Sequence, residues 1–143
     1  MELYEMAGHL IRRLHQNSTH VFQVRTRDAG LDMTPVQFAA MSAIHEAPGI
    51  DQATVAARIA YDRATIGGVM DRLEQKGWIS RQVSKRDRRA KEVSLTDDGN
   101  EVYRKAISVV RDLQSEILPG LCEQEQGQFL ELARKAAAHN EIT

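Results

Sequence analysis

Five basic side chains lie within the short stretch from Lys85 to Lys91, where Asp87 is the one acid. Over the wider span Arg58–Lys91 there are ten Lys or Arg and four Asp or Glu, a local charge of +6. The whole chain of 143 residues has a formal charge of −1, so the remainder carries −7. Cations gathered in this way neutralise phosphate groups. The segment is therefore typical of a protein that binds the backbone of nucleic acids.

The sequence around these cations predicts a β-hairpin. Ile79, Arg81 and Val83 alternate with polar neighbours, and Val93 and Leu95 repeat the alternation on the return. A period of two residues is that of a strand. The charged residues 85–89 fall at the turn between the two strands, so we expect them to project beyond the hairpin as a wing.

Two short helices are predicted in front of the hairpin. Asp51 is suited to cap the first helix, and Asp62 is suited to cap a second helix over residues 62–76, which Gly77 ends. The apolar positions of the second helix follow helical spacing: Ile66, Val69, Met70 and Leu73. Two short helices with a tight join are typical of a helix-turn-helix, in which the second helix contacts DNA.

Longer helices are predicted on both sides of this module. One covers residues 2–27, and another runs from a complete capping box at Thr34-Pro35-Val36-Gln37 to Glu46. Two more are predicted over 97–118 and 123–140, the first opening with Thr96-Asp97-Asp98. The terminal helices have more apolar face than a small central domain can cover, which favours a dimerisation region built from both ends.

The predicted fold class is mainly α with a small β-hairpin wing. We expect one domain over residues 1–143, with a winged helix-turn-helix DNA-binding lobe at 31–99. Residues 1–30 and 100–143 form the expected helical dimerisation region.

Three motifs in this order resemble the MarR family of bacterial transcriptional regulators. They are Asp71-Arg72-Leu73-Glu74 with Lys76-Gly77, then Asp87-Arg88-Arg89, and Leu95-Thr96-Asp97-Asp98-Gly99. The resemblance implies a homodimer that binds a pseudo-palindromic double-stranded DNA operator. It also implies a repressor that is released by a small-molecule effector, often an aromatic acid or a phenol.

The resemblance places the second helix of the module in the major groove and Arg89 in the minor groove, with Asp87 holding the wing tip by pairing with an arginine. Arg63 is suited to a guanine edge and Ala64 to a thymine methyl. Gly67-Gly68 interrupts this helix, and we expect it to permit close approach either to DNA or to a neighbouring helix. The predicted DNA-binding residues are Arg63, Ala64, Thr65, Gly68, Arg72, Lys85, Arg86, Asp87, Arg88 and Arg89.

A polar face of the first helix is the candidate effector site. An arginine with a histidine can hold a carboxylate by charge-assisted hydrogen bonds, and apolar walls complete such a pocket. An aromatic carboxylate is the ligand class that fits. The predicted ligand-binding residues are His9, Arg13, Gln16, His20, Phe38, Met41 and Tyr61.

Two alternatives remain open at this point. One is a zinc-responsive regulator of the same fold, although the five histidines form no compact ligand pair and no metal or cofactor is expected. The other is a helical dimeric adaptor whose basic hairpin docks an acidic protein. No motif for an enzyme is present, and Cys122 alone cannot form an internal disulfide. With no apolar run long enough for a membrane span, we expect a cytoplasmic protein. The resemblance implies that it is bacterial.

Overall fold

The computed structural model describes residues 1–138, which form two compact units. One unit comprises residues 1–21 together with those from 112 onward, and the other comprises residues 22–111. Both boundaries fall inside long helices, because the second part of one helix and the first part of another supply buried side chains to the larger unit. Those side chains are Phe22, Thr26, Tyr103, Ala106 and Val110.

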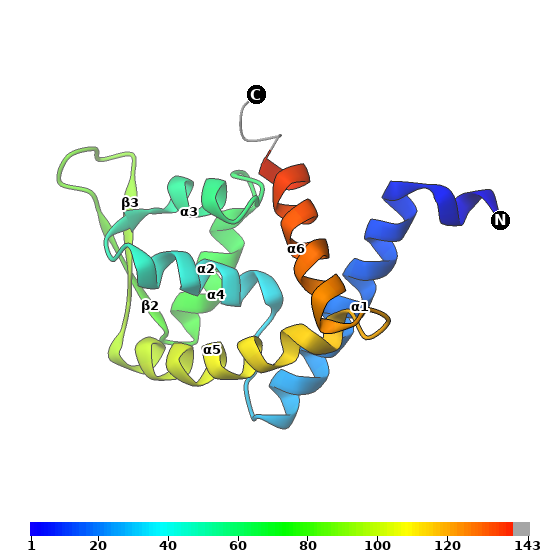
Figure 1. Ribbon diagram of the computed structural model, residues 1–143. Coiled ribbons are helices and arrows are strands. Elements are labelled where there is room, and N and C mark those ends of the chain that lie inside the picture. The colour runs from blue at the N-terminus through cyan, green and yellow to red at the C-terminus, as the bar shows by residue number, and fades with distance from the viewer. Residues whose placement is uncertain (139–143) are drawn as a thin grey trace. The chain divides into compact units, whose positions relative to one another are not determined.

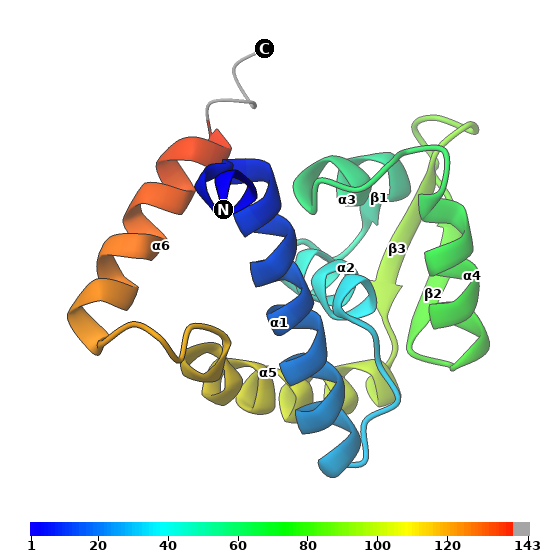
Figure 2. The same cartoon turned by 90° about the vertical axis from the view of Figure 1, so that its right-hand side faces the viewer.

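The larger unit contains the helix-turn-helix and the wing, as predicted (Figures 1 and 2). Its elements are the end of α1 (Ala7–Asp28), α2 (Pro35–Glu46), β1 (Ile50–Asp51), α3 (Gln52–Arg58), α4 (Ile66–Gln75), β2 (Ile79–Val83), β3 (Lys91–Leu95) and the start of α5 (Asp97–Ile117). The predicted start signals form in the structure. Thr34 and Gln37 make the capping box of α2, and the Asp51 carboxylate accepts a hydrogen bond from the Thr54 amide at 2.8 Å.

The sheet has a third strand that the alternation of residues did not predict. The two-residue β1 pairs antiparallel with β3, Ile50 opposite Val93, and β3 also pairs with β2, Ile79 opposite Leu95. This strand comes directly before α3, so it ties the start of the helix-turn-helix to the base of the wing. The largest fully buried side chains of the unit are Met41, Ile44, Val55, Ile66, Met70, Leu73 and Val93.

The smaller unit contains η1 (Glu2–Glu5), the first part of α1, the end of α5 and α6 (Glu123–Ala138). The predicted helix over residues 2–27 is therefore interrupted: a short 3-10 turn precedes α1, because the chain is extended at Met6 (φ −98°, ψ 123°). None of the α6 residues is buried, and Leu130 and Leu132 are 51% and 66% exposed. The smaller unit thus leaves much of its apolar surface uncovered.

Candidate nucleic-acid interface

The wing loop, residues 84–90, is closed by its own backbone and by two short polar side chains. The buried Ser84 hydroxyl accepts hydrogen bonds from the amides of Arg86 (3.2 Å) and Asp87 (3.3 Å). The Asp87 carboxylate accepts one from the Arg89 amide at 3.0 Å, and the Ser84 amide donates to the Ala90 carbonyl at 2.9 Å. The loop thus takes its shape without using a basic side chain.

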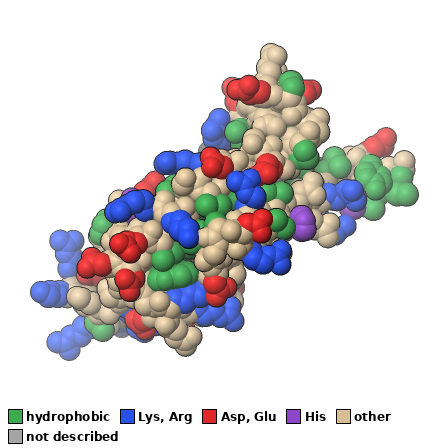
Figure 3. Space-filling view, turned by 90° about the horizontal axis from the view of Figure 1, so that it is seen from below, with side chains coloured by type: hydrophobic (Ala, Val, Ile, Leu, Met, Phe, Trp, Pro, Cys, Tyr) green, Lys and Arg blue, Asp and Glu red, His purple; other side chains and the backbone are tan. Residues whose placement is uncertain are grey.

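The four cations of the wing loop are consequently free to meet a partner. Lys85, Arg86, Arg88 and Arg89 are exposed, and no carboxylate of residues 1–138 forms an ion pair with any of them. Figure 3 shows Lys and Arg side chains projecting at the left-hand edge, where Figure 1 has the wing. The expectation that Asp87 pairs with an arginine side chain is wrong in one respect, since its partner is the Arg89 backbone.

The residues in front of α4 form a turn rather than the first turn of a longer helix. The α-helix begins at Ile66, not at Asp62, so the placement of Arg63, Ala64 and Thr65 on the helix is corrected. The Asp62 carboxylate accepts from the Ala64 amide at 3.1 Å, and the Thr65 hydroxyl donates to the Asp62 carbonyl. Asp62 therefore stabilises a local turn, and the three predicted contact residues are exposed on it.

A groove joins this turn to the wing. It has a volume of about 540 Å³, and Arg63 and Arg89, predicted separately, both line it. Lys91, the α3 cap Asp51 and the first α3 residue Gln52 also line it, although the motifs did not single them out as site residues. In Figures 1 and 2 the wing loop and the start of α4 lie at the same end of the unit.

Asp51 is one of two acids, with Asp87, that line this groove beside its three basic residues. The Thr54 backbone and hydroxyl hydrogen bonds, both 2.8 Å long, hold the pKa of its carboxyl below the usual value, and the charge of Arg63 adds to the effect. Asp51 is thus ionised at neutral pH, both as the cap of α3 and as a counter-charge to Arg63.

The exposed face of α4 contains Gly68 and Arg72, opposite the buried Ile66, Val69 and Leu73. A Cβ added at Gly68 would meet nothing within 4 Å, and one at Gly67 would meet the Gln52 side chain at an ordinary 3.6 Å. The glycines are therefore not required for packing against another helix. Their expected close approach to DNA stays a prediction.

Two cations of the basic segment are used inside the protein instead. The Arg81 guanidinium pairs with Asp71 at 2.7 Å and with Glu74 at 3.0 Å, which holds β2 against α4. The Glu74 hydrogen bond raises the pKa of Arg81, and the same bond lowers the pKa of Glu74. The Lys76 ammonium contacts Asp32 and Gln37. Local charge counting cannot distinguish these internal cations from free ones.

The candidate effector residues fall into two groups, one in each unit. On α1 the Arg13 guanidinium lies 5.3 Å from the centre of the Tyr4 ring, and the His9 ring meets Tyr4 edge-on at 5.4 Å. Gln16 and His20 on the same helix are exposed. Tyr4, not singled out from the sequence, therefore brings two of the four polar residues together.

The second group lies in the larger unit. Phe38 is partly buried and stacks on Tyr103 at 5.7 Å, and Tyr61 is 37% exposed between α3 and α4. Met41 has no exposed surface and belongs to the core of the unit, and its place in a pocket wall stays a prediction. Its helical spacing from Phe38 did not reveal that Met41 is fully covered by the core of the unit.

Comparisons with known proteins agree with this geometry. A model of the MarR family matches residues 33–91. The transcriptional regulator HosA of Escherichia coli O127:H6 is 33% identical over 135 residues, which cover 94% of this chain and 97% of HosA. This chain belongs to the MarR family.

Two solved structures place the MarR-family fold over nearly the whole chain. The PcaV regulator of Streptomyces coelicolor, in complex with its natural ligand, is 31% identical with a TM-score of 0.86, over 96% of each chain. Bordetella bronchiseptica BpsR, whose DNA binding is regulated by 6-hydroxynicotinic acid, is 28% identical with a TM-score of 0.84, over 93% and 94% of the two chains.

As a MarR-family member the protein is a DNA-binding transcription regulator and not an enzyme. Within residues 1–138 no helix is long and apolar enough to cross a membrane. Across the same residues, no three His, Cys, Asp or Glu side chains are grouped so that they could hold a metal ion.

Proposed function

We propose that this protein is a homodimeric repressor that binds a pseudo-palindromic operator and is released by a small aromatic acid or phenol. The observation that supports it best is the wing loop, whose four cations have no ion-pair partner within residues 1–138, at the same end of the unit as the exposed turn before α4. Arg63, Thr65 and Arg72 face the major groove, and Arg88 and Arg89 meet the minor groove. Minor grooves concentrate negative potential and favour arginine.

The homodimer accounts for the apolar surface of the smaller unit. Leu3, Tyr4, Met6, Leu10 and Ile11 are 41–64% exposed, and α6 adds Leu130 and Leu132. Exposed apolar side chains in such numbers are characteristic of an interaction site. A second copy of the same unit is the occupant that places two wings on half-sites roughly one helical turn, about 34–36 Å, apart.

The effector class is supported by the relatives. PcaV was solved with a natural ligand, and 6-hydroxynicotinic acid, an aromatic acid, regulates DNA binding by BpsR. On this chain the polar face of α1, with Arg13, His9, Gln16 and His20, offers a guanidinium and imidazoles to a carboxylate. The ligand releases the operator only if it binds better to the dimer that is unable to bind DNA.

Fluorescence anisotropy of the full chain on the DNA upstream of its own coding sequence tests the proposal. We expect binding that weakens steeply as salt rises, because each neutralised phosphate contributes about 0.9 to the slope of log K against log salt. The variant with both Arg88→Gln and Arg89→Gln has a smaller slope, with its dimer unchanged by light scattering. Equal affinity for operator and random DNA contradicts operator recognition, and a monomer at micromolar concentration contradicts the dimer.

A panel of aromatic acids, including 6-hydroxynicotinate and benzoate, then tests release. One of them is expected to lower operator affinity at a fixed salt concentration. If none of the panel changes the affinity, the effector part of the proposal is wrong and the DNA-binding part stands.

A further inference from the structure

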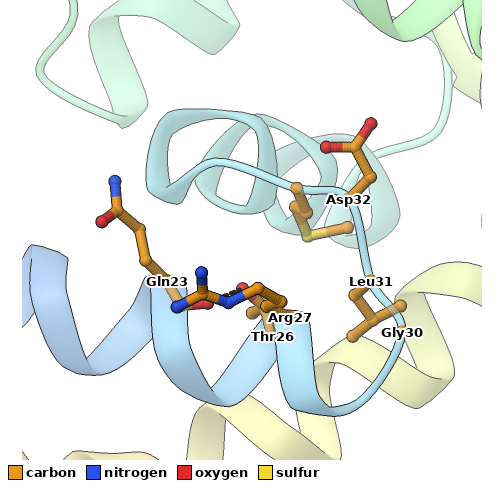
Figure 4. Close-up of a pocket in the computed structure, with 7 residues that line it drawn as sticks. Gln23, Thr26, Arg27, Gly30, Leu31 and Asp32 are labelled. Atoms are coloured by element: carbon orange, nitrogen blue, oxygen red, sulfur yellow. Dashed lines mark hydrogen bonds between the residues drawn. The ribbon is translucent and has the colours of Figure 1, made fainter.

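A second polar cavity lies at the corner between α1 and α2, separate from the residues assigned to the effector. It has a volume of about 440 Å³. Gln23 and Arg27, one turn apart on α1, line one side, and the loop of residues 30–33 lines the other (Figure 4). Gly30 makes the turn out of α1 with φ +74°, and the buried Leu31 and Met33 give the cavity an apolar lining.

The charged groups around this cavity suit an anion. The Arg27 side chain is exposed and has no hydrogen-bond or ion-pair partner within residues 1–138. The Lys105 ammonium lies 4.0 Å from the position that a Cβ on Gly30 would take. Asp32, the acid that lines the cavity, points its carboxylate away from Arg27 in Figure 4 and pairs with Lys76 at 3.6 Å.

The polar and apolar groups that line the cavity together fit a small organic carboxylate. A carboxylate matches the two parallel N–H groups of a guanidinium, and the Gln23 amide can donate a further hydrogen bond. Leu31 and Met33 suit a ring or a short alkyl group next to the carboxylate. An inorganic anion would leave this apolar lining unused.

The same loop is bonded to the recognition helix on its other side. Lys76 is the C-terminal cap of α4, and its ammonium donates to the Asp32 carbonyl and to Gln37 Oε1 (3.3 Å). It also lies 4.6 Å from the centre of the Trp78 ring. We call these contacts the Lys76 junction. The loop therefore borders the cavity with one side and the end of α4 with the other.

We propose that this cavity binds a small organic carboxylate and that its occupancy lowers operator affinity through the Lys76 junction. The inference rests on the proposed operator binding and adds a site apart from the polar face of α1. A bound carboxylate adds negative charge beside the loop that carries Asp32. It therefore favours loop positions in which Asp32 lies farther away and Lys76 loses a partner. A ligand that prefers this state weakens DNA binding. By linkage, bound DNA lowers the affinity for the ligand by the same factor.

Binding is tested on the full chain by ¹⁵N NMR with benzoate as the probe and benzamide as its neutral counterpart. We expect benzoate, and not benzamide, to shift the amide signals of Gly30 and Leu31. Arg27→Gln is expected to lower the affinity for benzoate by roughly tenfold or more, because the hydrogen bond between two charged groups is removed. The matched control is Arg13→Gln on the polar face of α1, which leaves the shifts at Gly30 unchanged.

The coupling is tested in the Arg13→Gln background, in which the polar face of α1 lacks its guanidinium. Lys76→Met is then added, which keeps the apolar stem of the side chain and removes the ammonium. In Arg13→Gln alone, benzoate is expected to lower operator affinity by about fivefold or more, a typical coupling. With Lys76→Met added, the NMR shifts at Gly30 persist, but benzoate changes operator affinity by less than about twofold.

Three outcomes overturn the inference. They are no benzoate shift at Gly30 and Leu31, loss of the shift in Arg13→Gln but not in Arg27→Gln, and full coupling retained in Lys76→Met. Absence of operator binding by the parent protein is a separate result, because it contradicts the proposed function while the NMR titration still reports on the cavity.

Discussion

The α-carbon of Gly99 lies so close to Trp78 that a Cβ on it would be 1.9 Å from the Trp78 carbonyl oxygen. The first turn of α5 thus lies directly against the chain that leaves α4. Around this contact the Thr96 amide donates to the Trp78 carbonyl at 3.0 Å, and the Thr96 hydroxyl donates to the Gly77 carbonyl at 2.6 Å. The same hydroxyl caps α5 by accepting from the Gly99 amide. The Leu-Thr-Asp-Asp-Gly motif is therefore a joint between the wing and the start of the long helix.

Gly99→Ala is expected to lower the free energy of unfolding by roughly 2–4 kcal/mol, because the added methyl collides with backbone that cannot move away. Urea denaturation measures the change. Gly127→Ala in α6 is the control, since a Cβ there meets nothing within 4 Å. Equal stability of the two variants would show that the α5 joint tolerates a side chain.

Gly68→Ala is expected to change stability and DNA binding in opposite directions. Alanine is a better helix former than glycine by up to about 1 kcal/mol, and the space around Gly68 is open, so the protein becomes more stable. The added methyl faces DNA, so operator affinity falls. Gly127→Ala again serves as the control, with increased stability and unchanged operator affinity. Unchanged operator affinity in Gly68→Ala would contradict a role for this glycine in close approach to DNA.

Arg81→Gln is expected to weaken operator binding without changing its salt dependence. Arg81 pairs with Asp71 and Glu74 and so positions the wing base against α4, while it neutralises no phosphate. The matched change at the tip, Arg88→Gln, lowers the salt slope by about 0.9 for each phosphate that Arg88 neutralises. Anisotropy titrations at several salt concentrations separate the two. A reduced slope in Arg81→Gln would assign this residue to the DNA contact surface.

Asp51→Asn is expected to remove part of the pH dependence of stability. The pKa of Asp51 is lowered in the folded protein, chiefly by the Thr54 backbone hydrogen bond, so the carboxylate stabilises the fold above its unfolded pKa of about 3.9. This stability is lost as pH falls through the lower, folded pKa. Asparagine also caps helices well, so the variant stays close to the parent at neutral pH.

Urea denaturation between about pH 6 and pH 3 measures this difference. The parent protein is expected to lose more stability than Asp51→Asn over that range. If the two proteins lose stability in parallel, the Thr54 hydrogen bonds do not favour the charged form of Asp51.

Elements whose causes are local could be predicted from the order of residues alone. The capping box of Thr34 and Gln37, the cap at Asp51 and the alternation in Ile79–Val83 act over a few residues, so each was visible as a pattern. The wing turn was visible for the same reason, because its Ser84 and Asp87 hydrogen bonds join neighbours in the chain. The order of these motifs was sufficient to indicate the family.

The division of the cations into free and internal ones depends on folding. Lys76 meets Asp32, Arg81 meets Asp71 and Glu74, and Ile50 pairs with Val93, in each case across a turn or a longer stretch of chain. A basic residue has the same local signature whether its partner is a phosphate or a carboxylate brought near by folding. The burial of a side chain is likewise decided by folding. Met41 and Phe38 lie on the same helix, but only Met41 is fully covered. These outcomes depend on distances between segments, which local periodicity does not encode.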